Sequence, residues 1–528
     1  MIPICTSQEI KKLDLLAKTH DPQAGFALMQ KASRIVFDFL ISEILKKQKM
    51  SIDSRVIVLA GKGNNGGDGL LAAAYLLEQG YKVDVFLFAK QDELQNEALQ
   101  ALNYLKEFDA DAIIAIENLS DIVQLKTFLN NDIEHQEHCF IIDALYGVSF
   151  DIQKHNQYLD EIVTIVKQSA IEKTIIAIDC PSGINNDTGH ISQNVLQATY
   201  TITMGFPKLG LFFFPAKAFV GILLVGDLNY PKDLIEQSLQ SHTYFVDTVK
   251  IFQVPRALNG SKYDHGCVAN IAGSFTMPGA AALSSKAILK AGAGLVYLYS
   301  KAFAQRFFDE LITKDFNDNS IEEILSNKKI DCISVGCGLG TQEQNAIFSL
   351  VQKSTKALIL DADAINVFEN NLDKLKNHKA QVLITPHYGE YQRLFKDEIL
   401  AQYSSQQLLE SVKSKAQEYK ISILLKGAPT IIADPSGEVF ILSVGNSGLA
   451  SAGTGDVLTG LIAGFMAQSS KRQNKVLNNS SLLTQNALLA AFIHGRTAEL
   501  VAPELTEYSL MASDILNNVH RAIKYSFN

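Results

Sequence analysis

Short runs of β-branched and aliphatic residues recur along the first half of the chain and alternate with helical stretches. These runs are RVIVLA, KVDVFLFA, CFIIDAL, TIIAIDC and GILLVGDL, at residues 55–60, 82–89, 139–145, 174–180 and 221–228. Strands that alternate with helices predict a mostly parallel sheet covered by helices on both faces. We expect a helical lead-in over residues 7–50 before the first strand.

A second alternation begins after a stretch, residues 230–260, that lacks sustained periodicity and contains Pro231, Pro255 and Asn259-Gly260. Its apolar runs are CVANIAGS, GLVYLYS, DCISVGCG, KALILDADA, QVLITP and ISILLKG, from residue 267 to residue 427. A chain of 528 residues is longer than the about 250–300 at which a single hydrophobic core stops growing. We therefore predict two layered α/β domains, residues 1–235 and 245–528. The two halves do not align convincingly with each other.

The composition is that of an ordinary globular protein, with 47% hydrophobic and 20% charged residues. A formal charge of −9 without a dense lysine or arginine run lacks the electrostatic footprint of a nucleic-acid or anionic-membrane partner. The most apolar stretch, residues 208–228, is interrupted by Pro215 and Lys217, so we do not expect it to span a membrane.

The six cysteines are scattered without a CxxC pair, which favours reduced thiols over a disulfide framework or a zinc site. The first residues, MIPICTSQEIKKLD, lack a basic region followed by an apolar stretch. We therefore expect a cytoplasmic protein. We also expect a homo-oligomer, although the sequence says nothing of its subunit number.

Glycines follow the first predicted strand in the segment GNNGGDG, residues 63–69. Glycines let backbone N–H groups approach a ligand closely, and the positive end of the following helix attracts phosphate. The spacing is neither GxGxxG with an acidic residue ~20 positions later nor a P-loop. A tight glycine turn into a helix explains this segment equally well.

Two other predicted strands end in polar residues followed by glycine. DALYG places Asp143 and Gly147 after one strand, and DCPSG places Asp179 and Ser182 after another. A single carboxylate at a strand end is usually a cap or turn residue. Because ligands of open α/β sheets bind at the carboxyl ends of the strands, three such ends together favour a binding site.

In the second half, GLASAGTGDVLTGLIAGFMA places Gly453, Gly455 and Asp456 at the start of a long apolar helix. Such a helix start binds anions, and an adjacent carboxylate can take the proton from an attacking hydroxyl, as phosphoryl transfer requires. A glycine turn with Asp456 as N-cap is the alternative. Lys426 in LLKGAPTII suits nucleotide phosphates or a sugar, and His387 in LITPHYGE is either a loop histidine or a substrate contact.

The order NNGGDG, DALYG, DCPSG resembles the N-terminal epimerase domain of NAD(P)H-hydrate repair proteins, over about residues 1–230. GSFTMPGAAALSSKAILKAGAG, SVGCGLG, DADA, TPHYGE, KGAPT and GTGD resemble the NAD(P)H-hydrate dehydratases, over about residues 255–528. The resemblance implies a Rossmann-like N-terminal domain and a ribokinase-like C-terminal domain.

The first resemblance implies roles for residues of the N-terminal half. Contacts to the hydrated dinucleotide are implied for Asn64, Asn65, Gly66, Gly67, Asp68, Gly147, Val148 and Ser149. Asn65, Asp143 and Ser182 match positions that hold a potassium ion, and oxygen ligands suit that cation. Asp179 matches the residue that binds the hydrated ring and handles its protons. Cys180 replaces an apolar residue of the family, and we expect little effect of this change.

The second resemblance implies that Ala280, Gly338, His387 and Asp456 contact the hydrate. Binding of the adenine nucleotide is implied for Lys426, Gly427, Ala428, Pro429, Thr430 and Gly455. Asp456 would be the catalytic base. Cys337 stands where the family usually has proline, which loosens the turn at Gly338 but keeps its glycines.

The implied function is repair of NADHX and NADPHX, the hydrated forms of NADH and NADPH. One half interconverts the R and S epimers with K⁺, and the other phosphorylates the 6-hydroxyl of the S form with Mg²⁺ and ADP or ATP. The sequence does not decide between the two nucleotides or the two hydrates. A vitamin or small-alcohol kinase of the ribokinase fold, with a non-catalytic N-terminal binding or scaffold module, is the alternative.

Overall fold

The computed structural model describes residues 1–45, 55–132, 138–150, 157–250, 256, 259–302, 307–397, 404–471 and 479–527. The chain divides into two compact units, Ile2–Ser241 and His242–Asn528, the second including Met1. Among the described helices, none is both long enough and apolar enough to cross a membrane.

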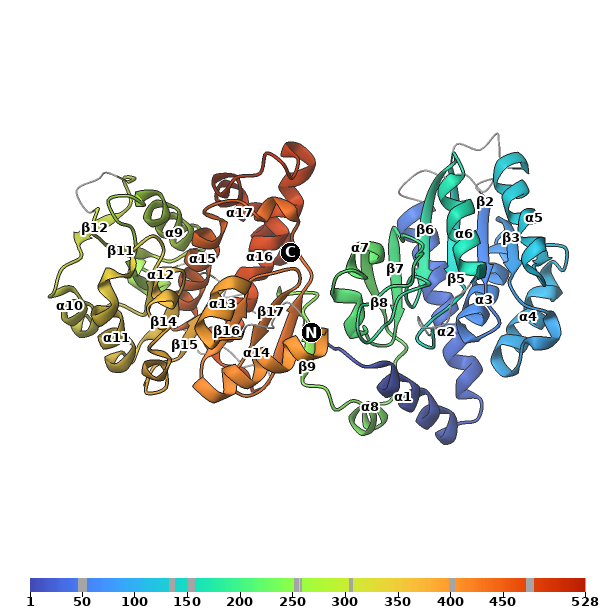
Figure 1. Cartoon of the computed structure of the whole chain (residues 1–528), viewed down its shortest axis with the longest axis horizontal. Helices are drawn as coiled ribbons and strands as arrows, with labels where there is room; N and C mark the ends of the chain where they lie inside the picture. Colours follow the sequence, from blue (N-terminus) through green and yellow to red (C-terminus); the bar gives the residue numbers. More distant parts are fainter. Residues whose placement is uncertain are drawn as a thin grey trace. The chain divides into compact units, whose positions relative to one another are not determined.

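The N-terminal unit is built on a seven-stranded sheet in the order β4-β3-β2-β5-β6-β7-β8, parallel throughout (Figure 1). Its strands are β2 (Arg55–Ala60), β3 (Lys82–Leu87), β4 (Ile113–Ala115), β5 (His138–Ala144), β6 (Glu172–Ile178), β7 (Tyr200–Met204) and β8 (Ile222–Gly226). The prediction of a parallel sheet is confirmed.

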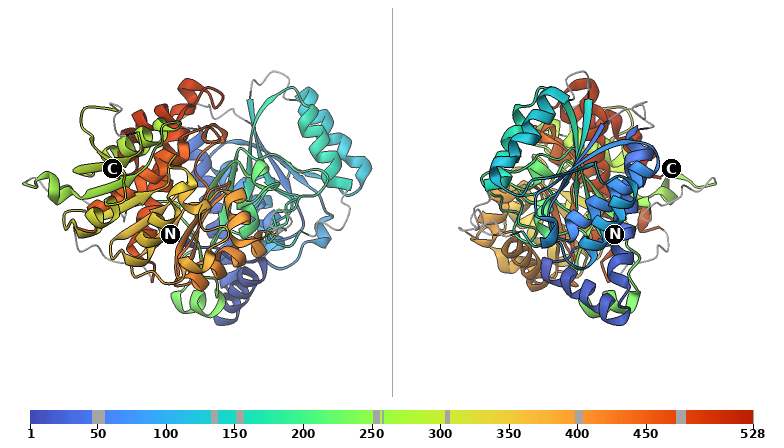
Figure 2. Two further views of the ribbon diagram at one scale, coloured as in Figure 1. Left: turned by 60° about the vertical axis from the view of Figure 1, so that its left-hand side comes forward. Right: turned by 90° about the vertical axis from the view of Figure 1, so that its right-hand side faces the viewer.

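Helices cover both faces of this sheet (Figure 2). The helices are α1 (Ser7–His20), α2 (Ala24–Phe39), α3 (Asn64–Glu78), α4 (Asn96–Phe108), α5 (Val123–Thr127), α6 (Gln157–Gln168), α7 (Lys217–Val220) and α8 (Lys232–Ser238). Alternate residues of β2 point to opposite faces, so that Val56 and Val58 pack with α2, α3 and α4 while Ile57 and Leu59 pack with α5 and α6. Burial on both faces explains the unbroken apolar runs in the sequence.

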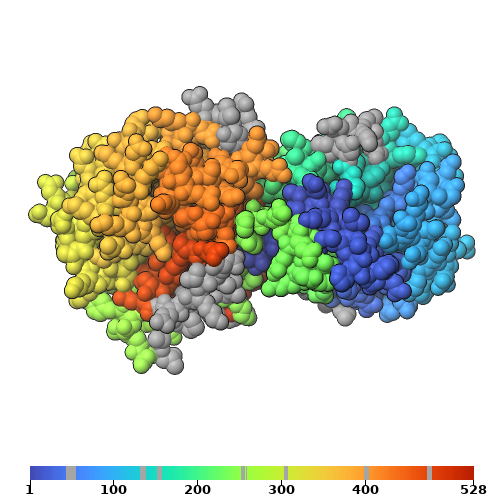
Figure 3. All heavy atoms as spheres, turned by 90° about the horizontal axis from the view of Figure 1, so that it is seen from below, coloured from blue at the N-terminus to red at the C-terminus, as the bar shows by residue number. Residues whose placement is uncertain are grey.

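Helix α1 lies outside these layers and packs against α8, far from it in the sequence (Figure 3). Buried Ile10, Leu13 and Ala17 form its apolar stripe. A capping box fixes its start, because the Thr6 hydroxyl accepts from the Glu9 backbone N–H and the Glu9 carboxylate accepts from the Thr6 N–H. The helix is thereby placed with one edge toward the carboxyl ends of the strands.

The C-terminal unit contains a mixed sheet in the order β9-β18-β17-β16-β15-β14-β13-β10-β11-β12. Its strands are β9 (Thr243–Phe245), β10 (Cys267–Ile271), β11 (Leu295–Ser300), β12 (Ile312–Asp315), β13 (Cys332–Val335), β14 (Ala357–Leu360), β15 (Val382–Ile384), β16 (Ser422–Leu425), β17 (Thr430–Ala433) and β18 (Val439–Leu442). All neighbours pair in parallel except β16 with β17 and β17 with β18. This arrangement confirms the prediction of a second layered α/β domain.

The main core of this unit lies between the sheet and the helices α9, α15, α16 and α17. The helices of the unit are α9 (Pro278–Lys290), α10 (Ser320–Ser326), α11 (Gln344–Lys353), α12 (Asp363–Asn366), α13 (Tyr388–Phe395), α14 (Ser405–Tyr419), α15 (Thr454–Ser469), α16 (Leu482–Leu505) and α17 (Ala512–Phe527). Helices α15 and α16 are buried around most of their circumference, which explains their weak amphipathic pattern.

Several strands were not predicted from the sequence. The pair β17–β18 is an antiparallel hairpin closed by Asp434-Pro435-Ser436-Gly437, in which the Gly437 N–H donates to the Asp434 carbonyl. This turn is a hairpin signal that can be recognised in the sequence. The strands β7, β9 and β12 are harder to predict, because they are short and contain no unbroken apolar stretch. The stretch 230–260, whose sequence lacks sustained periodicity, contains α8 and β9.

Helices α15 and α9 approach each other closely through two glycines of α15. A Cβ atom at Gly460 would lie 2.2 Å from the Ser284 carbonyl oxygen, and one at Gly464 would lie 2.5 Å from the Ile288 carbonyl oxygen. The two helices touch backbone to backbone, so the start of α15 is held firmly against α9.

We expect Gly460→Ala to destabilise the C-terminal unit by about 1–3 kcal/mol, because overpacking a filled contact outweighs the better helix propensity of alanine. The control is Gly279→Ala on α9, where an added Cβ meets nothing within 4 Å. Differential scanning calorimetry of the full chain measures both. Equal unfolding temperatures of the two variants would contradict the packing argument.

Candidate active sites

The glycine segment after β2 forms a tight entry into α3. Gly63 is the N-cap of α3, and a Cβ atom at Gly66 would lie 1.8 Å from the Gly61 carbonyl oxygen. Only glycine fits at position 66, where the first turn of α3 packs against the Gly61 carbonyl. The N-terminus of α3 therefore opens directly at the carboxyl end of β2, where its free N–H groups can bind an anion.

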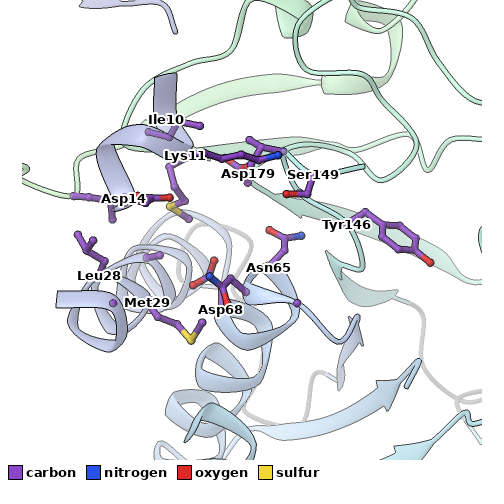
Figure 4. Close-up of a pocket in the computed structure, with 18 of the residues that line it drawn as sticks. Ile10, Lys11, Asp14, Leu28, Met29, Asn65, Asp68, Tyr146, Ser149 and Asp179 are labelled. Carbon is purple, nitrogen blue, oxygen red and sulfur yellow. Dashed lines mark hydrogen bonds between the residues drawn. The ribbon is translucent and has the colours of Figure 1, made fainter. Parts of the chain in front are cut away.

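A cavity of about 470 Å³ lies in front of this helix start, a volume typical of small-molecule sites. The structure gathers most of the predicted residues around it, namely Asn64, Asn65, Asp68, Gly147, Val148, Ser149 and Asp179 (Figure 4). Gly66 and Gly67 are buried and do not line it. They shape the turn rather than touch the cavity.

Asp179 is held at the cavity wall by a buried lysine that sequence reasoning missed. Asp179 has a φ of +67°, and its Oδ1 accepts a hydrogen bond from the Nζ of Lys208, which is 1% exposed. Lys208 Nζ also donates to the Thr203 hydroxyl and the Met204 carbonyl, both at 3.1 Å. Burial alone would lower the pKa of Lys208, but the surrounding negative groups, led by Asp179, outweigh it and raise that pKa. Lys208 therefore keeps its charge.

Two further carboxylates, Asp68 and Asp14, face the same cavity (Figure 4). Burial, followed by the charges of Asp179 and Asp14, raises the pKa of Asp68 well above its usual value. Burial also raises the pKa of Asp14, although the Tyr230 hydroxyl donates to its carboxylate. Crowding of these acids favours the neutral, proton-donating form of Asp68.

Lys208, Asp14 and Tyr230 were not identified from the sequence. A lone lysine inside the apolar run FPKLGLFFF is a signal for Lys208, because a buried lysine needs a partner. Asp14 lies four residues after Ile10 and so interrupts the apolar stripe of α1. Tyr230 is brought to the cavity only by the fold.

Asp143 is fully buried at the end of β5. Its carboxylate accepts from the Ser182 hydroxyl at 2.6 Å and the Ser182 N–H at 2.8 Å. Burial raises its pKa to about 6 despite these hydrogen bonds, and no basic side chain among the described residues forms an ion pair with it. The Asn65 Oδ1 atom lies against Gly147 of the loop that follows β5, 3.3 Å from where a Cβ atom of that glycine would stand. A buried carboxylate with hydroxyl and amide neighbours and no basic partner fits a hard cation.

The second site lies where α15 begins. Gly453, the N-cap of α15, has a φ of +87°, and Asp456 stands in the first turn. A Cβ atom at Gly455 would lie 3.6 Å from the Nζ of Lys426. The structure thus brings Lys426, Gly455 and Asp456 together at the positive end of a helix.

Lys426 is anchored by Asp361, at the end of β14, a residue that sequence reasoning noted only as part of DADA. Asp361 is 2% exposed, and its Oδ1 accepts from Lys426 Nζ at 2.9 Å and from the Thr385 hydroxyl at 2.7 Å. Burial opposes ionisation of Asp361, but Lys426 and the hydrogen bonds outweigh it and lower its pKa. Glu390 adds a weaker contact, 3.9 Å from the lysine nitrogen.

Among the described residues, no basic side chain forms an ion pair with Asp456. Burial, followed by the charge of Asp361, raises the pKa of Asp456 to about 6, while the Cys337 thiol and Lys426 act in the opposite direction. A carboxylate with this pKa is ionised at neutral pH and is basic enough to accept a proton.

The remaining predicted residues of this half lie nearby. Gly338, with a φ of +62°, abuts Ala280, since a Cβ atom on it would lie 2.9 Å from that of Ala280. His387 caps α13, its Nδ1 accepting from the Gly389 and Glu390 N–H groups, and its side chain is 56% exposed. Gly427, Ala428, Pro429 and Thr430 form the turn into β17, in which the Thr430 hydroxyl donates to the Gly427 carbonyl. His387 therefore has a capping role besides any contact with a ligand.

Comparison with known proteins gives matches along nearly the whole chain. Residues 25–210 match the family described as YjeF-related protein N-terminus, and residues 268–521 match NAD(P)H-hydrate dehydratase. The bifunctional NAD(P)H-hydrate repair enzyme Nnr of Dictyoglomus turgidum is 30% identical, over 98% of this chain and 98% of its own. The enzyme of the same name from Moorella thermoacetica is 29% identical, over 97% of this chain and 95% of its own.

Among solved structures, the ADP/ATP-dependent NAD(P)H-hydrate dehydratase from Bacillus subtilis, co-crystallised with ATP and Mg²⁺, is 26% identical. It covers 53% of this chain and 96% of its own, with a TM-score of 0.44. The full-length relatives and the two matched domains together show that the chain belongs to the family of bifunctional NAD(P)H-hydrate repair enzymes.

Proposed function

We propose that this protein repairs NADHX and NADPHX in two reactions. The N-terminal unit interconverts the R and S epimers, and the C-terminal unit dehydrates the S epimer at the expense of ADP or ATP. The observation that carries the proposal is that each unit places an aspartate, Asp179 or Asp456, beside a lysine at the carboxyl ends of its strands. Relatedness over the full length disfavours a vitamin kinase with a non-catalytic N-terminal module.

Dehydration requires that a poor leaving group, hydroxide, be converted into a good one. Asp456 takes the proton of the 6-hydroxyl, and the hydroxyl oxygen attacks the terminal phosphoryl group of the nucleotide. The bond between that phosphorus and the bridging oxygen breaks, so that ADP leaves as AMP, or ATP leaves as ADP. The phosphate then departs with the electrons of the carbon–oxygen bond, assisted by the lone pair of the ring nitrogen. Loss of a proton from carbon 5 restores the reduced nicotinamide.

The surroundings of Asp456 suit the charged group that is transferred. Lys426 offers a positive charge, and the start of α15 offers backbone N–H groups to the phosphates. The Mg²⁺ that accompanies the nucleotide would be held mainly by the phosphates and would neutralise their charge, which leaves Asp456 free to act as the base. Residues 426–430 then position the nucleotide against the base.

In the N-terminal unit, Asp179 handles the protons of the hydrated ring. Lys208 balances its charge and fixes its orientation at the cavity wall. Asp68, whose raised pKa favours the protonated form, faces the same cavity. The cavity therefore offers one proton acceptor and one proton donor, as inversion at a carbon that bears a hydroxyl requires.

We further infer that Asp143, Ser182 and Asn65 hold K⁺, which would balance the buried charge of Asp143 and brace the loop that carries Gly147. A cytoplasmic, homo-oligomeric protein completes the proposal. The six cysteines support the reducing location, because each is a free, buried thiol.

The two reactions should separate by mutation. Asp456→Asn is expected to lower the dehydration rate about a hundredfold to ten-thousandfold and to leave epimerisation intact, whereas Asp179→Asn does the reverse. Asparagine keeps the shape of each side chain and tolerates the positive φ of Asp179. Chromatographic separation of the R and S hydrates and NADH follows both reactions, with the exposed Asp318→Asn as control. Near-normal dehydration by Asp456→Asn would show that another group is the base.

The dehydration rate should depend on the ionisation of Asp456. Because its pKa is about 6 and the base must be ionised, kcat/KM for the S hydrate is expected to be constant at neutral pH and to fall as the pH drops below that value. Cys337→Ala removes a hydrogen bond that favours the carboxylate, so it should move the midpoint to higher pH. If Cys337→Ala leaves the midpoint of the pH profile unchanged, the group that titrates is the nucleotide and not Asp456.

Potassium should stabilise the N-terminal unit through Asp143. K⁺ in place of tetramethylammonium is expected to raise the thermal unfolding temperature, because a ligand that binds only the folded state stabilises it. Asp143→Asn should abolish this difference and Asp179→Asn should retain it. If K⁺ raised the unfolding temperature of the native chain and of Asp143→Asn equally, the cation would bind elsewhere.

A further inference from the structure

A cysteine that neither proposed reaction uses lies beside the base of the C-terminal unit. One ligand atom each from Cys337, Asp361 and Asp456 lie within 4.8 Å of one another. We propose that these three side chains form a binding site for a thiophilic divalent cation of the zinc class, and that its binding stops phosphoryl transfer by occupying Asp456. The inhibitory part rests on the function proposed for this unit, whereas the binding part does not.

The geometry of the pair Cys337 and Asp361 suits a tetrahedral cation. The Cys337 sulfur lies 3.6 Å from the Asp361 Oδ2 atom. With Zn–S near 2.3 Å and Zn–O near 2.0 Å, the sulfur-to-oxygen edge of a tetrahedron is about 3.5 Å. The two atoms therefore already stand at the spacing of bound ligands, and Asp456 closes a triangle with them.

The second oxygen of Asp361, Oδ2, accepts a hydrogen bond from the Cys337 thiol. Lys426 and Thr385 bind its other oxygen, Oδ1, so a cation at Oδ2 leaves the pairing with the lysine in place. The buried Thr459 hydroxyl is oriented so that it lowers the pKa of Asp361, yet it makes no hydrogen bond within the part of the chain that the structure describes. The Thr459 hydroxyl oxygen, which has no hydrogen-bond partner among the described residues, therefore faces Asp361 as well.

Charge also favours a cation at this position. Asp361 and Asp456 lie beside the Cys337 sulfur, and the thiol proton is donated to Asp361 Oδ2. A divalent cation replaces that proton, which passes to solvent, and offsets the negative charge of thiolate and carboxylates. Magnesium lacks this advantage, because it prefers oxygen ligands.

The position is reachable from one side. Cys337 and Asp361 are buried, at 1% and 2% exposure, but Asp456 is partly exposed at the start of α15. Within the described ranges, no other group of three potential metal ligands comes this close together. Cys332, buried in the preceding strand β13 and outside this group, therefore provides a matched control.

The test is a titration of the reduced, full-length protein with Co²⁺, a spectroscopic substitute for Zn²⁺, without nucleotide. We expect one equivalent to give the visible bands of a tetrahedral ion and a thiolate-to-metal charge-transfer band. Both should be lost in Cys337→Ala and retained in Cys332→Ala. Absence of the charge-transfer band in the native chain, or its persistence in Cys337→Ala, would overturn the site.

Activity provides the second measurement. Zn²⁺ at one equivalent should abolish dehydration by the native chain and leave epimerisation unchanged, a zinc-selective chelator should reverse the effect, and Cys337→Ala should resist it. Equal inhibition of native chain and Cys337→Ala would overturn the inhibitory role. A chain that shows the cobalt bands but never dehydrates the S hydrate would refute the proposed function and leave the metal site standing.

Discussion

Both sites depend on a carboxylate paired with a lysine at the carboxyl ends of the parallel strands. In the N-terminal unit Asp179 pairs with Lys208, and in the C-terminal unit Asp361 pairs with Lys426. Removing one partner of a buried pair leaves an uncompensated charge and typically costs about 3–5 kcal/mol. Such a pair fixes two side chains at once, so the loops that carry them have a defined position before any ligand binds.

Each pair also has a second carboxylate close to it. Lys426 is bound by Asp361, so among the described residues Asp456 is left without a basic partner and its pKa rises to about 6. Lys208 is bound by Asp179, and the nearby Asp68 has a raised pKa. Each site thus combines a carboxylate held by a lysine, Asp179 or Asp361, with a second carboxylate of raised pKa, Asp68 or Asp456. Neighbouring carboxylates in unlike environments are the usual means of assigning acid and base roles.

Much of this arrangement follows from the sequence. The apolar runs that became β2, β5, β6, β10, β13 and β14 are buried on both faces, so their composition identifies them without long-range information. The glycine segments and Asp143, Asp179 and Asp456 stand directly after strands or at a helix start, where local pattern reveals them.

Other features require the fold. Lys208 meets Asp179 across 29 residues, and Lys426 meets Asp361 across 65, distances over which composition carries no pairing information. Asp14 and Tyr230 come from α1 and the segment after β8, which only tertiary packing brings to the cavity. In the sequence Cys337 is one of six scattered cysteines and stands where the family usually has proline, and its closeness to two carboxylates appears only in three dimensions.

The most direct test of the account is to supply the native protein with a mixture of R and S hydrates of NADH, with Mg²⁺, K⁺ and either ADP or ATP. The return of the absorbance of reduced nicotinamide reports the outcome. Two working sites predict rapid and complete recovery with at least one of the nucleotides. Recovery of the S portion alone would reduce the N-terminal unit to a binding module, and no recovery with either nucleotide would contradict the account of the C-terminal site.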